Sequence, residues 1–178
     1  MKSNFVFTLT GPDRIGIVDE VTELLLDLGG NVETSRMSRL GGAFAMLVLI
    51  CLPAERVARL EGGISALIAR GYKVTVSPAD FGDTEGRSAW PSYRIEVRGA
   101  DHEGIIHEIA HSIARRGINI ESMETETAPA PISGAPLFTM TARIAAPPGL
   151  AQQDWEAELN DAGRRLNVEI EVSPSGRG

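Results

Sequence analysis

The strongest constraint on how this chain can fold is that it repeats itself. Residues 4–33 align without a gap on residues 92–121, at a shift of 88 positions. The eight identical pairs in this alignment are Gly11/Gly99, Asp13/Asp101, Gly16/Gly104, Ile17/Ile105, Glu20/Glu108, Gly29/Gly117, Asn31/Asn119 and Glu33/Glu121. A repeat of about 80 residues indicates that one structural unit is formed twice. The sequence therefore predicts two small domains rather than one larger domain.

The second copy carries a short insertion, and a polar segment separates the copies. Phe44 aligns with Phe138 only after six extra residues, which lie in the proline-rich stretch 128–136. Between the copies, Asp, Gly, Ser and Glu crowd together and the apolar periodicity disappears. We predict a first domain at residues 1–78, a linker at 79–91 and a second domain at 92–178.

Apolar periodicity predicts the same order of elements in both copies: strand, helix, strand, strand, helix, strand. In the first copy these are a strand at 5–9, a helix at 17–28, a strand pair at 32–40 and 43–52, a helix at 57–68 and a strand at 72–77. In the second copy they fall at 93–99, 103–117, 118–127, 137–146, 150–164 and 166–173. The βαββαβ order predicts an α+β protein with two ferredoxin-like domains. Each domain would have a four-stranded antiparallel sheet with both helices on one face.

Two features of the first copy depart from a regular repeat. The pair Gly62-Gly63 lies inside the second helix, where each glycine costs about 1 kcal/mol relative to alanine, so we expect a kink or break there. The strand at 43–52 is apolar on both faces, whereas its counterpart in the second copy alternates. We therefore expect the helix-free face of the first sheet to meet the second domain or another protomer. The single cysteine, Cys51, lies in this strand and is expected to be a small buried residue.

Composition narrows the functional class. Hydrophobic residues make up 43% of the 178 residues, and 17 Lys and Arg against 24 Asp and Glu give a net charge of −7. Because nucleic-acid binding depends on neutralising phosphates, direct binding to DNA or RNA is not expected. The N-terminus lacks the apolar segment of a secretory signal, and the longest apolar run, 43–52, is too short to span a bilayer. The sequence predicts a cytoplasmic protein that is not bound to a membrane.

The matched loops after the first strand of each copy are the best candidates for a ligand site. They read Gly11-Pro-Asp-Arg-Ile-Gly16 and Gly99-Ala-Asp-His-Glu-Gly104. The glycines allow a tight turn and a close approach of a ligand to the main chain, and the helix N-terminal amides that follow favour a carboxylate. Asp13 and Asp101 either accept hydrogen bonds from a ligand's ammonium group or cap the helices. Neither loop has the Lys-Ser/Thr pair of a P-loop.

Asn31 and Asn119 begin the second strand of each copy. A side-chain amide at this position can donate to a carboxylate and accept from an amine at the same time. The alternative is that both are turn residues after the preceding helix.

Taken together, these residues resemble a known family. A strand, Gly-x-Asp-x-x-Gly, an amphipathic helix, Gly-x-Asn-(Val/Ile) and a βαβ unit resemble the ACT domain, an amino-acid-sensing module of metabolic regulators. Two copies without an attached enzyme resemble the glycine cleavage system transcriptional repressors, over residues 3 to 174. The resemblance implies that an amino acid binds where the loop and the Asn meet, often across an interface between two ACT domains. It also implies that the regulator binds an activator protein rather than DNA.

The resemblance carries over to particular residues. The ligand-site residues that it implies are Gly11, Asp13, Arg14, Ile15, Gly16 and Asn31 in the first copy, and Asp101, His102, Glu103, Gly104 and Asn119 in the second. The second loop departs from the first because Glu103 stands where the first copy has Ile15. Its carboxylate would repel the carboxylate of an amino acid at close range. We therefore expect the two sites to differ in affinity, or only one to be used.

One motif suggests a different function. His107-Glu108-Ile-Ala-His111 matches His-Glu-x-x-His, in which two histidines on one helical face bind zinc and the glutamate acts on the metal-bound water. Glu121, Glu124 and Glu126 are candidates for a third ligand. Against this, the repeat aligns both histidines with the polar side of the helix in the first copy, where they meet Asp19 and Glu23. We therefore expect a solvated helix face, with adventitious metal binding at most.

The sequence thus predicts a non-enzymatic regulator without a cofactor, a metal or catalytic residues. It would sense a small amino acid, with glycine or serine expected from the family resemblance alone, and act as a homodimer on a partner such as a transcriptional activator. The alternatives are a detached regulatory subunit of an amino-acid or one-carbon metabolic enzyme, and a zinc-dependent hydrolase built on His107 and His111.

Overall fold

The computed structural model describes residues 2–79, 86–131 and 133–176 of the chain. The chain divides into two compact units, Met1–Gly82 and Asp83–Gly178, and each unit is described by itself. The predicted linker at 79–91 lies partly outside the described residues. Its described part includes a short 3-10 helix at Arg87–Ala89.

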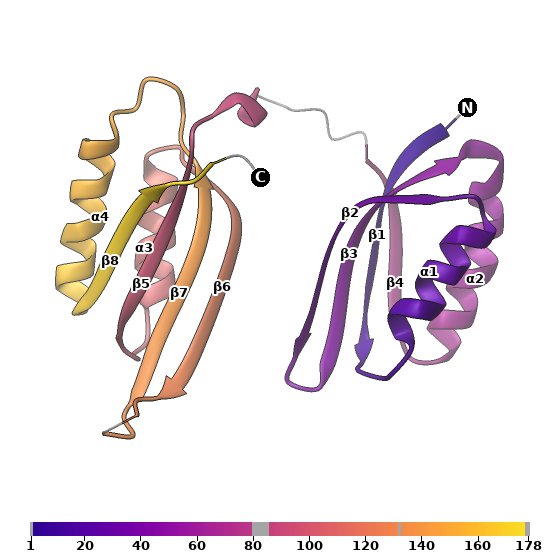
Figure 1. Cartoon of the computed structure of the whole chain (residues 1–178), viewed down its shortest axis with the longest axis horizontal. Helices are drawn as coiled ribbons and strands as arrows, with labels where there is room; N and C mark the ends of the chain where they lie inside the picture. Colours follow the sequence, from indigo (N-terminus) through magenta and orange to yellow (C-terminus); the bar gives the residue numbers. More distant parts are fainter. Residues whose placement is uncertain (1, 80–85, 132, 177–178) are drawn as a thin grey trace. The chain divides into compact units, whose positions relative to one another are not determined.

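The first unit contains one antiparallel sheet and two helices. Its elements are β1 (Lys2–Pro12), α1 (Ile17–Asp27), β2 (Asn31–Leu40), β3 (Ala43–Pro53), a 3-10 helix (Ala54–Arg56), α2 (Val57–Ala69) and β4 (Lys73–Pro78). The strands are ordered β2-β3-β1-β4, and both helices cover the same face of the sheet (Figure 1). The β2–β3 hairpin turns at Gly41 and Gly42, as the sequence predicts, and both glycines have positive φ.

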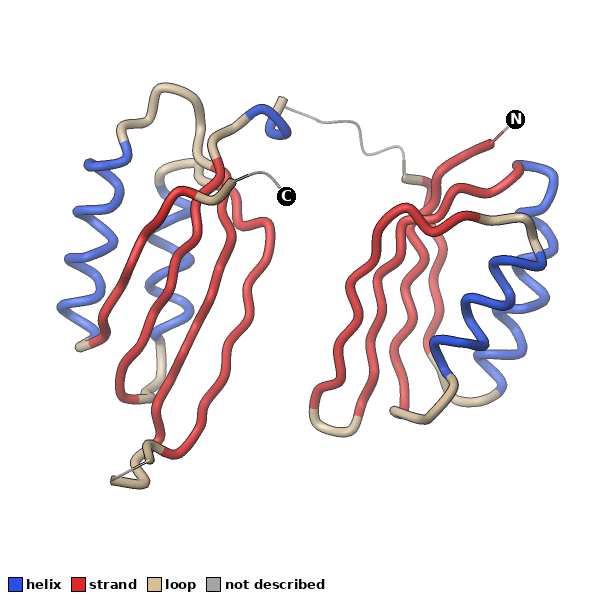
Figure 2. Tube along the Cα trace, viewed as in Figure 1, coloured by secondary structure: helices blue, strands red, loops and turns tan. Residues whose placement is uncertain are grey.

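The second unit repeats this arrangement. Its elements are β5 (Ser92–Ala100), α3 (Ile105–Arg115), β6 (Asn119–Pro129), β7 (Pro136–Ala145), α4 (Gln152–Leu166) and β8 (Val168–Pro174). The strands are ordered β6-β7-β5-β8, again with both helices on one face (Figure 2). The predicted fold, two ferredoxin-like βαββαβ units, is therefore confirmed. The insertion at 128–136 lies between β6 and β7, and its residue 132 is outside the described part.

Each unit has its own hydrophobic core between sheet and helices. In the first unit the predicted strand residues Phe7 and Leu9 are fully buried beneath Val21 and Leu25 of α1. In the second unit Trp155 of α4 is buried, and its ring meets that of Tyr93 edge-on at 5.2 Å between centroids. A separate core in each unit is what a repeated structural unit requires.

The break expected at Gly62-Gly63 is wrong, because α2 runs without interruption from Val57 to Ala69. A β-carbon on Gly63 would stand 2.3 Å from a methyl group of Leu24 on α1. The side chain of Leu24 therefore occupies the space that a larger residue would need. Close packing between the two helices accounts for glycine at position 63.

The helix-free faces of the two sheets differ in chemistry. In the first sheet, Val6 and Thr8 of β1 lie opposite Leu49 and Leu47 of β3, and the side chain of Leu47 is 48% exposed. Cys51 faces the same side and is half-buried, so the expectation of a buried cysteine is wrong. In the second sheet the matching face is charged: Arg94 and Arg98 flank Glu96 and pair with it at 2.7 and 3.1 Å.

The described helices include none that is both long and apolar enough to cross a membrane.

Candidate ligand-binding loops

The N-cap position that ends the first loop is occupied by a glycine, not by the aspartate. Gly16 is the N-cap residue of α1, with a φ of 87°, and its carbonyl accepts the hydrogen bond from the amide of Glu20. No side chain caps this helix, and the same holds for Gly104 and α3. The capping role considered for Asp13 and Asp101 is therefore wrong. Both glycines have a left-handed conformation that a larger residue adopts only at a cost.

The carboxylate of Asp13 instead forms an ion pair across the loop. Its Oδ2 lies 2.8 Å from Nε of Arg39, near the end of β2, while the backbone amide of Asp13 donates to the carbonyl of Gly42 at 3.0 Å. The Asp13 side chain is 33% exposed and that of Arg39 69%. A carboxylate and a guanidinium thus lie side by side in contact with solvent. The repeat contains no second arginine at this position, because Thr127 matches Arg39 in the second unit.

Arg14 and Tyr72 hold the first loop against the rest of the unit. The buried Tyr72 hydroxyl donates to the carbonyl of Pro12 and accepts from Nε of Arg14, both at 3.0 Å. Glu20 pairs with Arg14 and also with Arg70, just beyond the end of α2. The hydrogen bond to Glu20 is the main cause that raises the pKa of Arg14. Arg14 is thus engaged within its own unit.

Gly11 is needed because Tyr72 lies directly over it. A β-carbon at Gly11 would be 2.4 Å from Cδ1 of the tyrosine ring. In the second unit a β-carbon at Gly99 would be 2.7 Å from a methyl group of Val168 and 3.0 Å from the carbonyl oxygen of Asn167. The space beside each glycine is therefore filled by residues of the same unit and not by a ligand.

The second loop is held by different chemistry. His102, which matches Arg14, places Nε2 at 2.7 Å from the carbonyl oxygen of Leu166 and Nδ1 at 3.0 Å from that of Glu103. The hydrogen bond to Leu166 is the main cause that raises the pKa of His102, followed by the one to Glu103. The backbone amide of Asp101 donates to the carbonyl of Pro136 at 3.0 Å, as Asp13 does to Gly42.

Ile15 and Glu103 mark the difference between the two loops. Ile15 is fully exposed, although it is a large apolar residue. Glu103 is also exposed and occupies the matched position. The first loop therefore presents an apolar side chain beside an Asp–Arg pair, whereas the second presents two carboxylates, those of Asp101 and Glu103.

Asn31 lies far from the loop of its own unit. Pro12 and Leu40 both lie beside Ala43 at one end of the sheet, whereas Asn31 pairs with Cys51, eight residues farther along β3. At about 3.3 Å per residue this is about 25 Å. Asn119 is likewise far from its loop, and its Oδ1 accepts a hydrogen bond from Arg87 at 3.5 Å. The structure brings Asp13, Arg14 and Gly16 together, but not Asn31.

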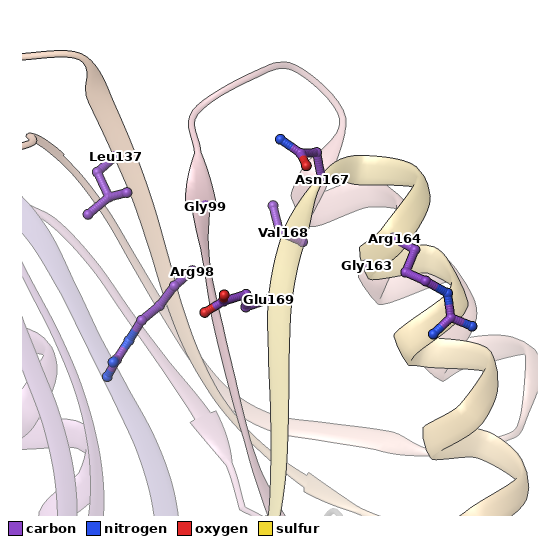
Figure 3. Close-up of a pocket in the computed structure, with 8 residues that line it drawn as sticks. All are labelled: Arg98, Gly99, Leu137, Gly163, Arg164, Asn167, Val168 and Glu169. Atoms are coloured by element: carbon purple, nitrogen blue, oxygen red, sulfur yellow. The ribbon is translucent and has the colours of Figure 1, made fainter. Parts of the chain in front are cut away.

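A hollow of about 520 Å³ lies at the end of the second sheet, beside Gly99 and Val168. Figure 3 shows that the side chains of Arg98 and Arg164, which also line it, extend away from each other. Each of these arginines is already paired with an acid, Arg98 with Glu96 and Arg164 with Asp161. Because these two side chains point apart, the hollow offers few polar groups that converge on a ligand.

The histidine pair offers no metal centre. His107 and His111 are exposed on α3, with ring centroids 6.0 Å apart and nearly parallel planes. Glu121, one of the expected third ligands, pairs instead with Arg143 at 3.0 Å. Within the described residues, no three His, Cys, Asp or Glu side chains lie close enough together to hold a metal ion. Zinc chemistry needs at least three protein ligands, so the hydrolase alternative has no geometric support.

Three contacts of the candidate loops could not be inferred from the sequence. Tyr72, Arg39 and Leu166 reach the loops from 58, 26 and 64 residues away along the chain. The only related feature in the sequence is the matched glycine pair, Gly11 and Gly99, which indicates that something lies close to the loop but not which residue it is.

Comparison with known proteins places the first of these loops in a family. Residues 3–71 match the family model described as the ACT domain. The crystal structure of an unknown protein from Galdieria sulphuraria is 33% identical over 99% of this chain and 100% of its own, with a TM-score of 0.83. A protein assigned as a glycine cleavage system transcriptional repressor is 21% identical over 99% of both chains, with a TM-score of 0.71, and so shares the fold. A search of curated proteins finds no match.

Proposed function

This chain belongs to the ACT-domain family, and from that premise we propose that it is a non-enzymatic regulator that binds a small amino acid and controls a partner protein by direct contact. The observation that carries the proposal is the pair Asp13–Arg39 at the first loop. A zwitterionic amino acid needs an acceptor for its ammonium group and a donor for its carboxylate. The exposed carboxylate of Asp13 and guanidinium of Arg39, which pair with each other at 2.8 Å, would exchange that pairing for the two charged groups of the ligand.

The first unit is the better amino-acid site. Its loop combines Asp13 with the cation of Arg39, followed by the N-terminal amides of α1. The second loop has Asp101 and Glu103 but no arginine at the position of Arg39, so the carboxylate of an amino acid would be repelled there. Of the two outcomes expected from the sequence, we therefore favour a single used site. Glycine and serine remain the proposed ligands, on family resemblance alone.

We propose that the site is completed by a second copy of the chain. Because Asn31 and Asp13 lie about 25 Å apart along the sheet of one unit, the two cannot contact one small ligand. The strand β2 runs from Asn31 to Leu40, so antiparallel pairing of β2 with the β2 of a second copy would bring Asn31 of that copy to the Asp13 end. Each of the two sites would then combine one loop and one asparagine.

The apolar residues at this edge support the same dimer. Ten large hydrophobic side chains are exposed in the described part of the chain, and six of them lie on β2, on α1 and in the loop before it: Ile15, Val18, Leu26, Val32, Met37 and Leu40. Leu26 and Leu40 are 72% and 73% exposed. A ten-residue edge strand beside such a patch exposes backbone groups that another strand can pair with. In contrast, the matched strand β6 carries three glutamates.

The helix-free face of the first sheet is the proposed contact for the partner protein. It presents Val6, Leu47 and Leu49, with Arg36 of β2 opposite Leu47, whereas the second sheet carries Arg94, Glu96 and Arg143 at the positions matching Val6, Thr8 and Leu49. A transcriptional activator is the proposed partner, in line with the family resemblance. The alternative is a metabolic enzyme, in which case this chain would be its detached regulatory subunit. Affinity purification followed by identification of the captured protein separates these two.

Calorimetric titration of amino acids into the purified protein tests the proposal. We expect one small amino acid to bind without being consumed, and Asp13→Asn to abolish this binding. The matched control, Asp101→Asn, removes the equivalent carboxylate from the second loop and should leave binding intact. Absence of binding by all twenty amino acids, or equal loss in both variants, would contradict the proposed site.

A further inference from the structure

His102 connects the second loop to the end of α4 through both of its ring nitrogens. Nε2 lies 2.7 Å from the carbonyl oxygen of Leu166, and Nδ1 lies 3.0 Å from the carbonyl oxygen of Glu103. A carbonyl oxygen can only accept a hydrogen bond. Both contacts are therefore hydrogen bonds only when both ring nitrogens carry a proton, that is, when the imidazole is positively charged.

The charges around His102 favour this protonated form. Leu166 is the last residue of α4, so its carbonyl lies at the negative end of the helix dipole. The adjacent carboxylate of Asp101 also favours the cation, and Glu103 adds a second carboxylate in the same loop. Arg164 and Arg165 in the last turn of α4 oppose it, although Arg164 is paired with Asp161. The hydrogen bonds outweigh the partial desolvation of the ring, and the pKa of His102 lies above its ordinary value of 6.5.

In the first unit, the corresponding loop is held by Arg14, whose side chain does not titrate near neutral pH. Arg14, at the matched position, donates to the hydroxyl of Tyr72 and pairs with Glu20. Its guanidinium remains protonated at all physiological pH values. In the second unit the residue that faces the loop glycine is Val168 rather than tyrosine, so no hydroxyl is available and the loop relies on the backbone carbonyl of Leu166.

We propose that His102 is a pH-sensitive latch that holds the loop 101–104 against the C-terminal end of α4 and releases it when the imidazolium loses its proton. Without the second proton, one ring nitrogen faces a carbonyl oxygen with its lone pair, and that contact becomes repulsive. The second loop opens as the pH rises, whereas the first loop stays closed. If the proposed function holds, the surface of the second unit changes with pH, whereas that of the first unit changes when the amino acid binds.

The direction of the effect of pH on stability follows from the raised pKa of His102. A group whose pKa is raised by folding contributes its full stabilisation below its unfolded value, here 6.5, and loses it as the pH rises through the folded value. The latch is therefore closed in mildly acidic solution and open in alkaline solution. The ratio of open to closed loop should increase about tenfold for each pH unit by which folding raises the pKa.

Titration of the histidine ring nitrogens by NMR, without any amino acid, is the first test. The chain has only three histidines, so His102→Gln assigns the resonance, and His107→Ala serves as the control on an exposed helix face. We expect the pKa of His102 to lie above its ordinary value of 6.5, and the backbone signals of Glu103 and Asn167 to change as the ring titrates. If the pKa of His102 lies at or below 6.5, the latch does not exist.

Amide hydrogen exchange of the two loops is the second test, with rates corrected for the intrinsic dependence on pH. Protection of residues 101–104 should fall as His102 loses its proton, while that of residues 13–16 should not. His102→Arg, which restores the residue of the first unit, should keep the second loop protected at high pH. An unchanged pH profile in His102→Gln would overturn the proposal. Because neither test contains an amino acid, both outcomes are independent of whether the chain is an amino-acid sensor.

Discussion

The Nε atom of Arg14 donates a hydrogen bond to the buried hydroxyl of Tyr72 at 3.0 Å, and its Cζ atom lies 5.8 Å from the centre of the tyrosine ring. The same hydroxyl also donates to the carbonyl of Pro12, so Tyr72, three residues after the end of α2, is joined to the loop before α1. This contact sets the position of the candidate ligand loop. It also leads to the first prediction.

Tyr72→Phe should destabilise the first unit by about 1 kcal/mol, because it leaves the Pro12 carbonyl and Arg14 without their shared partner. The loop should also become more mobile, so the amide of Asp13 should exchange faster. The control is Tyr93→Phe in the second unit, which keeps its ring contact with Trp155. Denaturant unfolding and amide exchange check both effects, and equal behaviour of the two variants would argue against the anchoring role of the hydroxyl.

Gly11→Ala and Gly99→Ala should each destabilise the unit that contains them by about 1–3 kcal/mol. The added methyl group would lie 2.4 Å from the ring of Tyr72 in one case and 2.7 Å from Val168 in the other. Gly62→Ala is the matched control, because nothing lies within 4 Å of its β-carbon and alanine is the better helix former. It should stabilise α2 by up to about 1 kcal/mol. Denaturation curves that fail to separate the control from the other two would contradict this packing.

Leu26→Glu should weaken or abolish the proposed dimer. The side chain of Leu26 is 72% exposed on α1, and in the proposed dimer a charge there would be buried by a second copy. The matched position in the second unit is Ala114, and Ala114→Glu serves as the control. Sedimentation velocity should show a dimer for the wild type and the control, and a monomer for Leu26→Glu. A wild-type monomer at all concentrations would rule out this interface.

Leu47→Lys should reduce binding of the partner protein and leave amino-acid binding unchanged. Leu47 lies on the helix-free face of the first sheet, on the inner strand β3 opposite Arg36 of β2 and four residues from the Ala43 end beside the loop. Thr141→Lys places the same charge at the matched position of the second sheet, which already carries Glu96 and Arg98 nearby. Partner capture that falls equally in both variants would indicate that the apolar face has no special role.

Much of the fold could be predicted from the sequence because the repeat shows the pattern of each helix and strand twice. The turn at Gly41-Gly42 and the strand that contains Phe7 and Leu9 follow from local pattern alone. The break at Gly62-Gly63 could not be judged in this way, since Leu24 of another helix fills the space beside Gly63. A local preference was overridden by a contact distant in sequence.

The candidate site was less predictable than the fold. The sequence indicated Asp13 and His102 as candidates but not their partners, Arg39 and Leu166, because those contacts depend on the closed sheet and on the end of α4. It also grouped Asn31 with the loop, although the two lie at opposite ends of one unit. Identical residues in a repeat show that a position matters, whereas only the structure shows what it contacts.

The central claim is that an amino-acid site combines the loop of one protomer with the asparagine of another, and a mixed dimer tests it most directly. Asp13→Asn and Asn31→Ala would be coexpressed with different tags, and the heterodimer purified through both tags. Neither variant alone should bind an amino acid, whereas the heterodimer keeps one intact site and should bind about half as much ligand as the wild type. A heterodimer that binds nothing, or an Asn31→Ala homodimer that binds like the wild type, would contradict the account.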